Sequence, residues 1–259
     1  VLLFFVFMKK LYYFFIFFII FLVLVGYYFF VYDSTVGVTR DKIVIGSSSA
    51  LSGHTGFLGT EVDKGARAYI KEVNKLGGVN SRKIELISYD DKYEPSLTIE
   101  NTRKLIYEDE VFLLFNYVGT PTSVSIMDFV SREEVPLVGL FTGSSLLRDP
   151  FQKYIINIRS SYNQEVEAVV DHFVDDMNFT KVALFYQLDD FGLSGYYALE
   201  KSLKKRGLEI NSYAGYERGS DEVSSAVEKI SKSDSELVVM FGTYSPLSKF
   251  VEESHKLGF

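Results

Sequence analysis

The stretch "VFLLFNYVGTPTSVSI", residues 111–126, decides the fold. Residues 111–118 are apolar at nearly every position, as expected for a strand that is buried on both faces of a parallel sheet. The run ends at Gly119. Thr120 followed by Pro121 is a common helix start, with threonine at the N-cap and proline at the first helical position. We therefore predict a buried strand over 111–118 and a helix over 120–134 that Thr120 caps.

The same strand–helix order continues on both sides of this stretch. Strands are predicted over 42–51, 83–91, 111–118 and 135–141, with helices over 59–78, 95–109 and 120–134 between them. This order predicts a parallel sheet that is covered by helices on both faces. Ligands of such sheets bind at the carboxyl ends of the strands.

The alternation restarts after Met177. A strand and a turn over 154–165 lead into a helix that reaches Met177. Further strands are predicted over 181–187, 209–216 and 236–242, and helices over 191–207, 220–233 and 245–258. The predicted fold class is α/β, with two Rossmann-like units over residues 33–159 and 160–259. Because three strands make a small second sheet, we expect the C-terminus to be truncated.

The N-terminal segment differs from the rest of the chain. Residues 11–32 are largely apolar and carry no charge, Lys9 and Lys10 precede them, and Asp33 follows. A helix of about 20 apolar residues crosses a bilayer, and the lysines favour a cytoplasmic N-terminus. A cleavable signal peptide is the alternative, but its apolar region is about 7–15 residues and ends at a small-residue site. We predict a signal anchor over residues 1–32, with the remainder outside the cytoplasmic membrane.

Composition excludes several kinds of chemistry. The formal charge is −7 and the basic residues are scattered, so no nucleic-acid partner is predicted. The chain has no cysteine, which excludes disulfides, thiolate metal sites and cysteine nucleophiles. No phosphate-binding loop and no GxSxG elbow is present. His172 and His255 fall in predicted helices, whereas His54 lies in a strand-end loop and is a candidate for ligand contact.

One pair of carboxylates leaves two interpretations open. Asp90 and Asp91 end a predicted strand, where they could hold a metal or accept a phosphoryl group. The alternative is a solvated turn in which they cap the next helix. We favour the turn, because the other parts of a metal or phosphoryl site are not visible. No metal or cofactor is predicted, and the absence of a catalytic constellation favours binding over catalysis.

Two clusters of hydroxyls suggest a site for an anion. Thr120 starts a helix, whose N-terminus presents free N–H groups and a partial positive charge. The next strand end supplies Thr142, Gly143 and two serines. Because neighbouring strand ends of a parallel sheet can face one crevice, the two clusters suit a carboxylate.

Six segments of the chain resemble the periplasmic substrate-binding proteins of the leucine/isoleucine/valine-binding family. They are "KIVIGSSSALSG", "GARAYIKEVNKLGGVNSRKIELISYDD", "VGTPTSVSI", "VPLVGLFTGSSLLRDP", "KVALFYQLDDFGLSG" and "LVVMFGTYSP". They occur in this order over nearly all of residues 42–259. The resemblance implies a type I periplasmic-binding fold, in which two lobes joined by a hinge close around a solute. Family members are longer, which again implies missing C-terminal parts of both lobes.

The resemblance also implies ligand-binding residues. It places a ligand carboxylate on Thr120 with the backbone of Gly119, and on Thr142 with Gly143. Side chains that would line the pocket are Leu58, where the family often has an aromatic residue, Phe191, where it often has tyrosine, and Tyr244, at a strand end of the second lobe.

One departure from the family pattern concerns the ammonium group of an amino acid. Members that bind amino acids hold it with an acidic residue shortly after the last segment. Here Leu247 stands near that position, and no carboxylate follows until Glu252. Because a buried ammonium without a partner is costly, an aliphatic or aromatic acid, an amide or a urea-like solute fits as well as an amino acid.

Three classes of function remain. The leading prediction is a periplasmic solute-binding protein that delivers a small carboxylate- or amide-bearing solute to an ABC permease. The runner-up is the ligand-sensing ectodomain of a membrane receptor such as a sensor kinase. An enzyme on the same frame is the third, but no base or nucleophile is evident.

Overall fold

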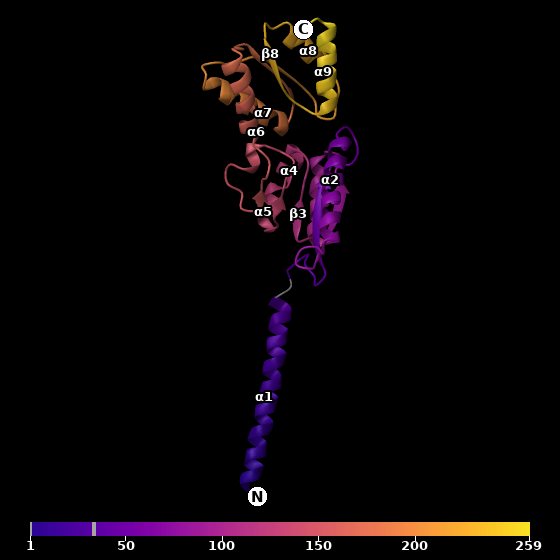
Figure 1. Cartoon of the computed structure of the whole chain (residues 1–259), viewed down its shortest axis with the longest axis vertical. Coiled ribbons are helices and arrows are strands. Elements are labelled where there is room, and N and C mark those ends of the chain that lie inside the picture. The colour runs from indigo at the N-terminus through magenta and orange to yellow at the C-terminus, as the bar shows by residue number, and fades with distance from the viewer. Residues whose placement is uncertain (1, 33–34) are drawn as a thin grey trace.

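The computed structural model describes the backbone of residues 2–32 and 35–259; the side chains of residues 2–7, 9–11 and 28–32 also lie outside the description. The first element, α1 (Leu2–Tyr32), is one uninterrupted helix (Figure 1). Tyr12, Phe17 and Tyr27 are among its exposed side chains. Within the part of the chain that is described, no helix combines the length and the apolar character needed to span a bilayer. Part of the predicted signal anchor lies outside the described residues, namely residue 1 and several side chains, those of Lys9 and Lys10 among them.

The first lobe is a five-stranded parallel sheet with its helices. The strand order is β2-β1-β3-β4-β5, and all four neighbouring pairs are parallel. Its strands are β1 (Lys42–Ser49), β2 (Lys83–Asp90), β3 (Leu113–Phe115), β4 (Leu137–Val138) and β5 (Ile155–Ile156). Its helices are α2 (Gly56–Lys75), α3 (Pro95–Tyr107), α4 (Thr120–Ser125), α5 (Met127–Arg132) and the 3-10 turn η1 (Ser145–Leu147). Leu114 and Leu137 are fully buried in its core.

The second lobe is a three-stranded parallel sheet in the order β7-β6-β8. Its strands are β6 (Val182–Gln187), β7 (Ile210–Tyr216) and β8 (Leu237–Phe241). Its helices are α6 (Tyr162–Val170), the π-helical η2 (Asp171–Asp176), α7 (Asp190–Lys204), α8 (Ser224–Ser231) and α9 (Tyr244–Lys256). All six residues of β6 are buried, because it is the central strand with helices on both faces. The predicted α/β class with parallel sheets is confirmed.

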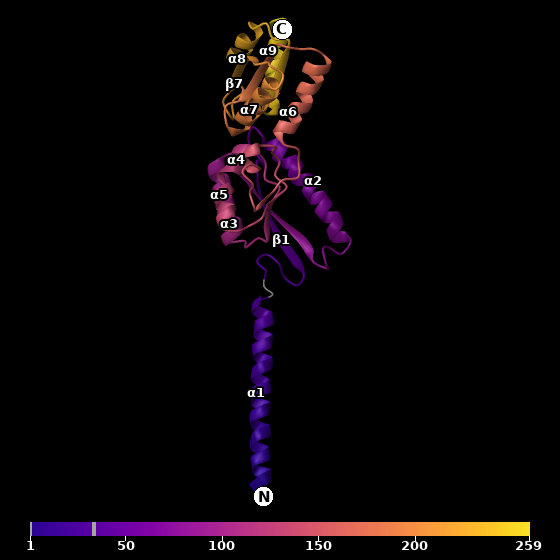
Figure 2. The ribbon, with the colours of Figure 1, turned by 90° about the vertical axis from the view of Figure 1, so that its left-hand side faces the viewer.

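The two lobes are stacked, with α4 of the first and α6 of the second near the junction (Figures 1 and 2). The chain crosses between them in the segment from β5 to α6, residues 157–161. The predicted division after residue 159 falls in this segment and stays a prediction.

The predicted helix over 120–134 is wrong in two details. It is two short helices, α4 and α5, separated at Ile126, whose φ of −112° is not helical. Ser125 Oγ donates to the carbonyl of Thr122 at 2.7 Å, and such side-chain bonds compete with the helical ladder. Thr120 is also not the N-cap: that position is Gly119, and the cap makes no side-chain hydrogen bond.

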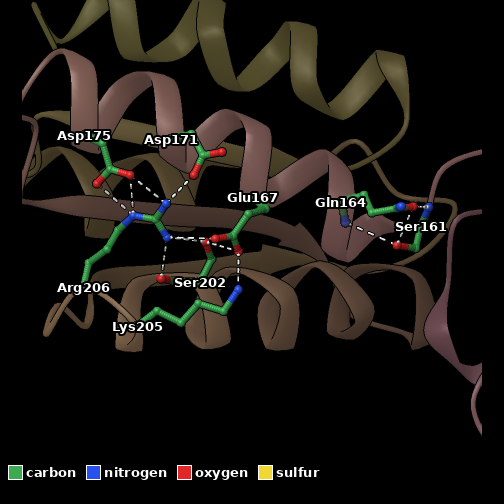
Figure 3. A network of polar contacts seen from close by, with 8 residues as sticks. All are labelled: Ser161, Gln164, Glu167, Asp171, Asp175, Ser202, Lys205 and Arg206. Atoms are coloured by element: carbon green, nitrogen blue, oxygen red, sulfur yellow. Dashed lines mark hydrogen bonds and ion pairs between the residues drawn. The ribbon is translucent and has the colours of Figure 1, made fainter.

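The predicted helix up to Met177 is α-helical only to Val170 and continues as the π-helix η2 from Asp171 to Asp176. Arg206 of the α7 end bonds Asp175 of η2 with Nε at 2.9 Å and Glu167 of α6 with Nη1 at 3.1 Å, and it also contacts Asp171 (Figure 3). Lys205 bonds Glu167 at 2.9 Å. These neighbouring cations, Lys205 first, lower the pKa of Glu167 to about 2 although partial desolvation opposes the shift. These ion pairs therefore connect α6 and η2 to the segment that directly follows α7.

The expectation of a solvated turn at Asp90 and Asp91 is wrong for Asp91. Its side chain is fully buried, and it accepts hydrogen bonds from Ser48 Oγ at 2.8 Å and from the Tyr93 backbone N–H at 3.0 Å. Burial raises the pKa of Asp91, while these hydrogen bonds oppose the shift. Asp90 instead ties the β1 and β2 ends together, accepting from Leu51 N at 2.9 Å and Ser52 Oγ at 2.5 Å. Among the described residues no acidic or histidine cluster suits a metal ion.

Candidate functional site between the lobes

A cavity of about 370 Å³ lies between the lobes at the carboxyl ends of their strands, where open parallel sheets bind ligands. Residues of both lobes and of the crossing segment line it: Leu58, Tyr93, Gly119, Thr120, Phe141, Arg159, Tyr162, Glu165, Phe191, Gly242, Thr243, Tyr244 and Leu247. Its volume suits one small solute. A groove of about 740 Å³ between α8 and α9 lies at the far end of α9 from Tyr244, away from the strand ends.

Part of the first-lobe wall of this cavity is built from tightly packed small residues, beside the larger side chains of Leu58, Tyr93 and Phe141. The Oγ1 atoms of Thr120 and Thr142 share a hydrogen bond of 2.7 Å, and Thr142 Oγ1 lies 3.3 Å from the hydroxyl of Tyr162. Thr120 and Thr142 are almost wholly buried. Because the two hydroxyls bond each other, they help to fix the shape of this wall.

Gly119 gives this wall its particular backbone path. Its φ is +104°, a region that favours glycine, and a Cβ there would overlap the ring of Tyr93 and lie 2.8 Å from Thr122 Oγ1. Tyr93 is itself buried and stands where the two lobes meet. Burial, and secondly the negative charge of Asp189 in the second lobe, raise the pKa of Tyr93, so its phenol stays protonated. The close approach of residue 119 to Tyr93 is therefore possible only because glycine has no side chain.

The second-lobe wall is aromatic and more open. Phe191 packs against Tyr162 with ring centroids 5.5 Å apart and against Phe241 at 6.0 Å. Tyr244 begins α9 and remains 45% exposed. Its hydroxyl donates across the gap to the carbonyl oxygen of His54 at 2.9 Å, and its ring meets that of Phe57 edge-on at 5.8 Å. This wall therefore offers apolar contact area together with a link to the first lobe.

The charged residues of the lining come from the chain between the two sheets. Arg159 Nη2 donates to Glu165 Oε1 at 2.8 Å. The Arg159 guanidinium also lies over the rings of Phe141, at 5.3 Å, and Tyr162, at 5.7 Å. A cation and an anion thus stand side by side in an otherwise largely aromatic cavity.

The structure brings five of the seven predicted site residues to the cavity: Leu58, Gly119, Thr120, Phe191 and Tyr244. Thr142 and Gly143 lie behind this lining. A Cβ on Gly143 would come 2.7 Å from the Tyr162 ring, which covers it. Leu247, which stands in place of an expected carboxylate, also lines the cavity, whereas Glu252 is not on the lining. Whether these residues bind a ligand stays a prediction.

Sequence reasoning missed Tyr93, Phe141, Arg159, Tyr162 and Glu165. Tyr93 comes two residues after Asp91, its φ is +67°, and it lies near Asp189 of the second lobe. Arg159 and Glu165 lie in the segment "RSSYNQE", for which the sequence pattern predicts only a turn and a helix start. The sequence did offer one signal, namely Ser161 as the cap of a helix that begins directly after the crossing segment. Residues at such a place lie close to both lobes.

His54 lies beside a second, smaller cavity of about 200 Å³, which shares Tyr93 and Thr243 with the first. At its edge Arg218 of the second lobe approaches Glu94 of the first at 3.4 Å. His172 and His255 are exposed on helices of the second lobe, as expected for surface residues.

Comparison with known proteins agrees with this architecture. The sequence profile of the family described as periplasmic binding protein matches residues 42–259. An amino acid binding protein from Pseudomonas aeruginosa is 23% identical over 218 residues, 83% of this chain and 58% of the relative. The Leu/Ile/Val-binding protein homolog 3 of Brucella melitensis is 26% identical over 203 residues, 78% of this chain and 54% of the relative.

Solved structures show the same fold. A substrate-binding periplasmic protein from Ralstonia solanacearum superposes with a TM-score of 0.78 at 30% identity, covering 84% of this chain and 61% of that one. A possible leucine/isoleucine/valine-binding protein from Rhodopirellula baltica gives 0.81 at 28% identity, covering 87% and 62%. The chain thus spans less than two thirds of the length of these relatives.

The family is one of binding proteins, in agreement with the expectation of binding rather than catalysis. The resemblance noted from the sequence is confirmed, since the family profile covers both lobes and the fold matches that of solved members. The chain belongs to the periplasmic binding protein family, in the group of the type I leucine/isoleucine/valine-binding proteins.

Proposed function

We propose that this chain captures a small carboxylate- or amide-bearing solute, amino-acid-like in size, between its lobes outside the cytoplasm and delivers it to an ABC permease. The observation that carries the proposal is the cavity at the strand ends, which is lined from both lobes at once. Relatives with this fold include a branched-chain amino acid transporter substrate binding protein from Streptococcus pneumoniae in complex with isoleucine. A fatty acid ABC transporter substrate-binding protein from Thermomonospora curvata also shares the fold, so the fold leaves the solute open.

The proposed mechanism is closure of the two lobes, whose predicted division follows residue 159, about the crossing segment. Contacts already bridge the lobes, namely Tyr244 to the His54 carbonyl, Arg218 to Glu94, and Ser144 Oγ to Ser194 Oγ at 2.8 Å. A solute that touches both walls adds to these contacts and favours the closed state. Its differential affinity for the two states sets how far the equilibrium shifts.

Within the cavity, Gly119 and Thr120 form the floor on the first lobe, and Thr142 with Gly143 supports them from behind. Leu58, Phe191 and Tyr244 supply the contact area around an apolar portion of the solute. Apolar and aromatic walls with a few placed polar groups are typical of small-molecule sites.

We also propose that residues 11–32 tether the protein to the cytoplasmic membrane, with both lobes on the outer side. The support is the uninterrupted helix α1 and its exposed apolar side chains, for example Phe14, Phe21 and Leu24. Fractionation of cells that express the chain tests this. Recovery in carbonate-washed membranes is expected, and release into the soluble periplasmic fraction would contradict the tether.

Thermal melting against a panel of solutes tests the binding function. The chain is purified in mild detergent and melted with branched and aromatic amino acids, aliphatic and aromatic acids, and amides or urea-like compounds. A solute at about 100 times its dissociation constant adds about 2.7 kcal/mol to the free energy of unfolding, which raises Tm measurably. A well-folded protein whose Tm no member of the panel changes would contradict solute capture.

A second candidate function is the sensing ectodomain of a membrane receptor, and the long helix α1 favours it. The coding sequence beyond Phe259 distinguishes the two. A second membrane span followed by a cytoplasmic signalling domain would indicate a receptor, whereas an end shortly after the lobes would indicate a transport component.

A further inference from the structure

Tyr93 belongs to the first lobe, in the turn between β2 and α3, but the second lobe helps to bury it. Only 6% of its surface is exposed. It lines both the cavity of about 370 Å³ and the cavity of about 200 Å³, and residues of both lobes line each of them. Its ring therefore lies at the junction, where solvent would reach it if the lobes moved apart.

The second-lobe groups near the Tyr93 hydroxyl form a buried polar network. Burial raises the pKa of Tyr93 most, the charge of Asp189 raises it further, and contact with the side chain of Gln187 opposes the shift. Gln187 is 1% exposed, and its Nε2 donates to Asp189 Oδ2 at 2.6 Å. The hydroxyl of Tyr216 donates to Gln187 Oε1 at 3.1 Å. Tyr93 thus brings a first-lobe hydroxyl to a network that otherwise lies within the second lobe.

The first lobe fixes the backbone from which Tyr93 projects. Lys92 and Tyr93 have φ values of +53° and +67°, a left-handed conformation that residues other than glycine rarely adopt. Asp90 Oδ1 accepts from the Lys92 N–H at 2.9 Å, and Asp91 Oδ1 accepts from the Tyr93 N–H at 3.0 Å. The fully buried carboxylate of Asp91 also accepts from Ser48 Oγ at 2.8 Å. Strained backbone of this kind persists only where neighbouring groups hold it.

We propose that Tyr93 holds the two lobes together in the absence of solute. Opening exposes its ring to water and separates its hydroxyl from Gln187, and both changes are unfavourable. The contacts of Tyr244 and Arg218 across the gap are at partly exposed positions, where water competes with them. The closed state is then populated before a solute arrives, so less of the binding free energy is used for closure. The inference rests on the lobe closure of the proposed function, but it needs no solute.

Spin-label distances between the lobes test the proposal. Because the chain has no cysteine, two introduced cysteines carry the only labels. Lys64→Cys on α2 and Lys256→Cys on α9 place one label on an exposed position of each lobe. After exhaustive dialysis and with no solute added, the full chain in mild detergent should give one short distance between the labels.

Two substitutions of Tyr93 should open the lobes to different degrees. Tyr93→Phe should lower the ratio of closed to open molecules about 10-fold, as expected when a buried polar group loses its partner, so that a second, longer distance appears. Tyr93→Ala also removes the ring and should shift most molecules to the longer distance. Circular dichroism checks that each variant is folded, and Tyr93→Phe decides alone if Tyr93→Ala does not fold.

Tyr117→Phe is the matched control. Tyr117 is also a buried tyrosine of the first lobe, but its hydroxyl shares a hydrogen bond of 3.0 Å with Thr102 of the same lobe. This variant should lower Tm and leave the distance between the labels unchanged. If it opens the lobes as much as Tyr93→Phe does, general loss of stability causes the opening and the inference is overturned.

Two further outcomes would overturn the inference, namely an original chain that is already open without solute and identical distances in the original chain and the folded Tyr93 variants. Both leave solute capture intact, because the melting panel tests it separately. Conversely, a panel in which no solute raises Tm overturns solute capture, while opening of the lobes by Tyr93→Phe would still support this inference.

Discussion

The two walls of the interlobe cavity are built on opposite plans. The first-lobe wall has a part that is small and buried, with Gly119 at positive φ and two threonine hydroxyls that bond each other. The second-lobe wall includes the rings of Tyr162, Phe191 and Tyr244, and Tyr244 is 45% exposed. A tightly packed wall tolerates little change because neighbouring atoms cannot move away. We therefore expect mutations in the first wall to cost folding and mutations in the second to cost mainly ligand affinity and lobe closure.

The largest effect is expected for Gly119→Ala. The added methyl group meets the Tyr93 ring at a φ of +104°, so both backbone strain and overlap oppose folding. Strain of this kind costs about 1–3 kcal/mol, and overpacking a core costs about 1–3 kcal/mol more. Urea denaturation should show a loss of about 3 kcal/mol or more in the free energy of unfolding.

Gly77→Ala is the matched control for that substitution. Gly77 has nearly the same φ, +105°, but no atom lies within 4 Å of the added carbon. It should show the strain alone, about 1–2 kcal/mol. Equal losses for the two variants would mean that contact with Tyr93 contributes nothing and that the first wall is not tightly packed.

The next effect concerns the paired hydroxyls. Thr142→Val keeps the shape but leaves the Thr120 hydroxyl and the Ser144 N–H, which lies 3.2 Å from Thr142 Oγ1, without this partner. A loss of about 1–3 kcal/mol is expected for such unpaired buried groups. The double variant Thr120→Val with Thr142→Val should recover part of it, because the Thr120 hydroxyl is then absent, while the Ser144 N–H and the Tyr162 hydroxyl still lack Thr142 Oγ1. Strictly additive losses in this double-mutant cycle would show that the two hydroxyls act independently.

The stability of the two lobes should also respond differently to low pH. In the first lobe, burial raises the pKa of Asp91, so the folded state binds this proton more tightly and gains stability as the pH falls through that pKa. In the second lobe, Lys205, Ser202 and Arg206 lower the pKa of Glu167 to about 2. Its contribution is present above the unfolded-state value near 4.5 and is lost as the pH falls toward 2. Acid should therefore weaken the second lobe first.

Amide hydrogen exchange, corrected for the intrinsic rate at each pH, can follow the two lobes separately. Between pH 5 and about 2.5, protection of α6 and α7 should fall before that of β1 and α3. Glu167→Gln should remove part of this difference. Simultaneous loss of protection in both lobes would argue against separate electrostatic control.

The smallest effect is expected for Tyr244→Phe. It removes the hydrogen bond to the His54 carbonyl at a partly exposed position, worth about 0.5 kcal/mol. The radius of gyration from small-angle scattering should rise slightly without a change in the Tm of either lobe. Tyr213→Phe is the control, because Tyr213 is equally exposed but lies on β7. If both variants scatter alike, the bond does not hold the lobes together.

The order of strands and helices was predictable because each buried strand is a short apolar run and each helix an amphipathic one. The break at Ile126 was not predictable, since it depends on where the hydroxyl of Ser125 points. The N-cap was assigned to Thr120 by residue type, yet its hydroxyl bonds a strand end 22 residues away. Sequence rules for helix caps consider only hydrogen-bond partners that are near in sequence. Here the hydroxyl of Thr120 bonds a partner that is distant in sequence, Thr142.

In the candidate site, Thr120 was predictable from its place at a strand end, whereas Leu58 and Phe191 were predicted from the resemblance to the leucine/isoleucine/valine-binding family. The site was not predictable where it depends on the crossing segment. Arg159 and Glu165 look like an ordinary surface pair in sequence, because nothing in "RSSYNQE" shows that rings from both lobes surround them. Asp91 likewise looks like a turn residue until the burial of its carboxylate is known.

The bond between Tyr244 and position 54 has an uneven genetic consequence. The acceptor is a main-chain oxygen, which every residue at position 54 would present equally, while the donor is a phenol hydroxyl that among the aromatic residues only tyrosine carries. Substitutions of His54 should therefore preserve this contact, whereas substitutions of Tyr244 should remove it. A saturation library screened for solute uptake should therefore show many tolerated substitutions at position 54 and few at position 244, although both residues make the contact.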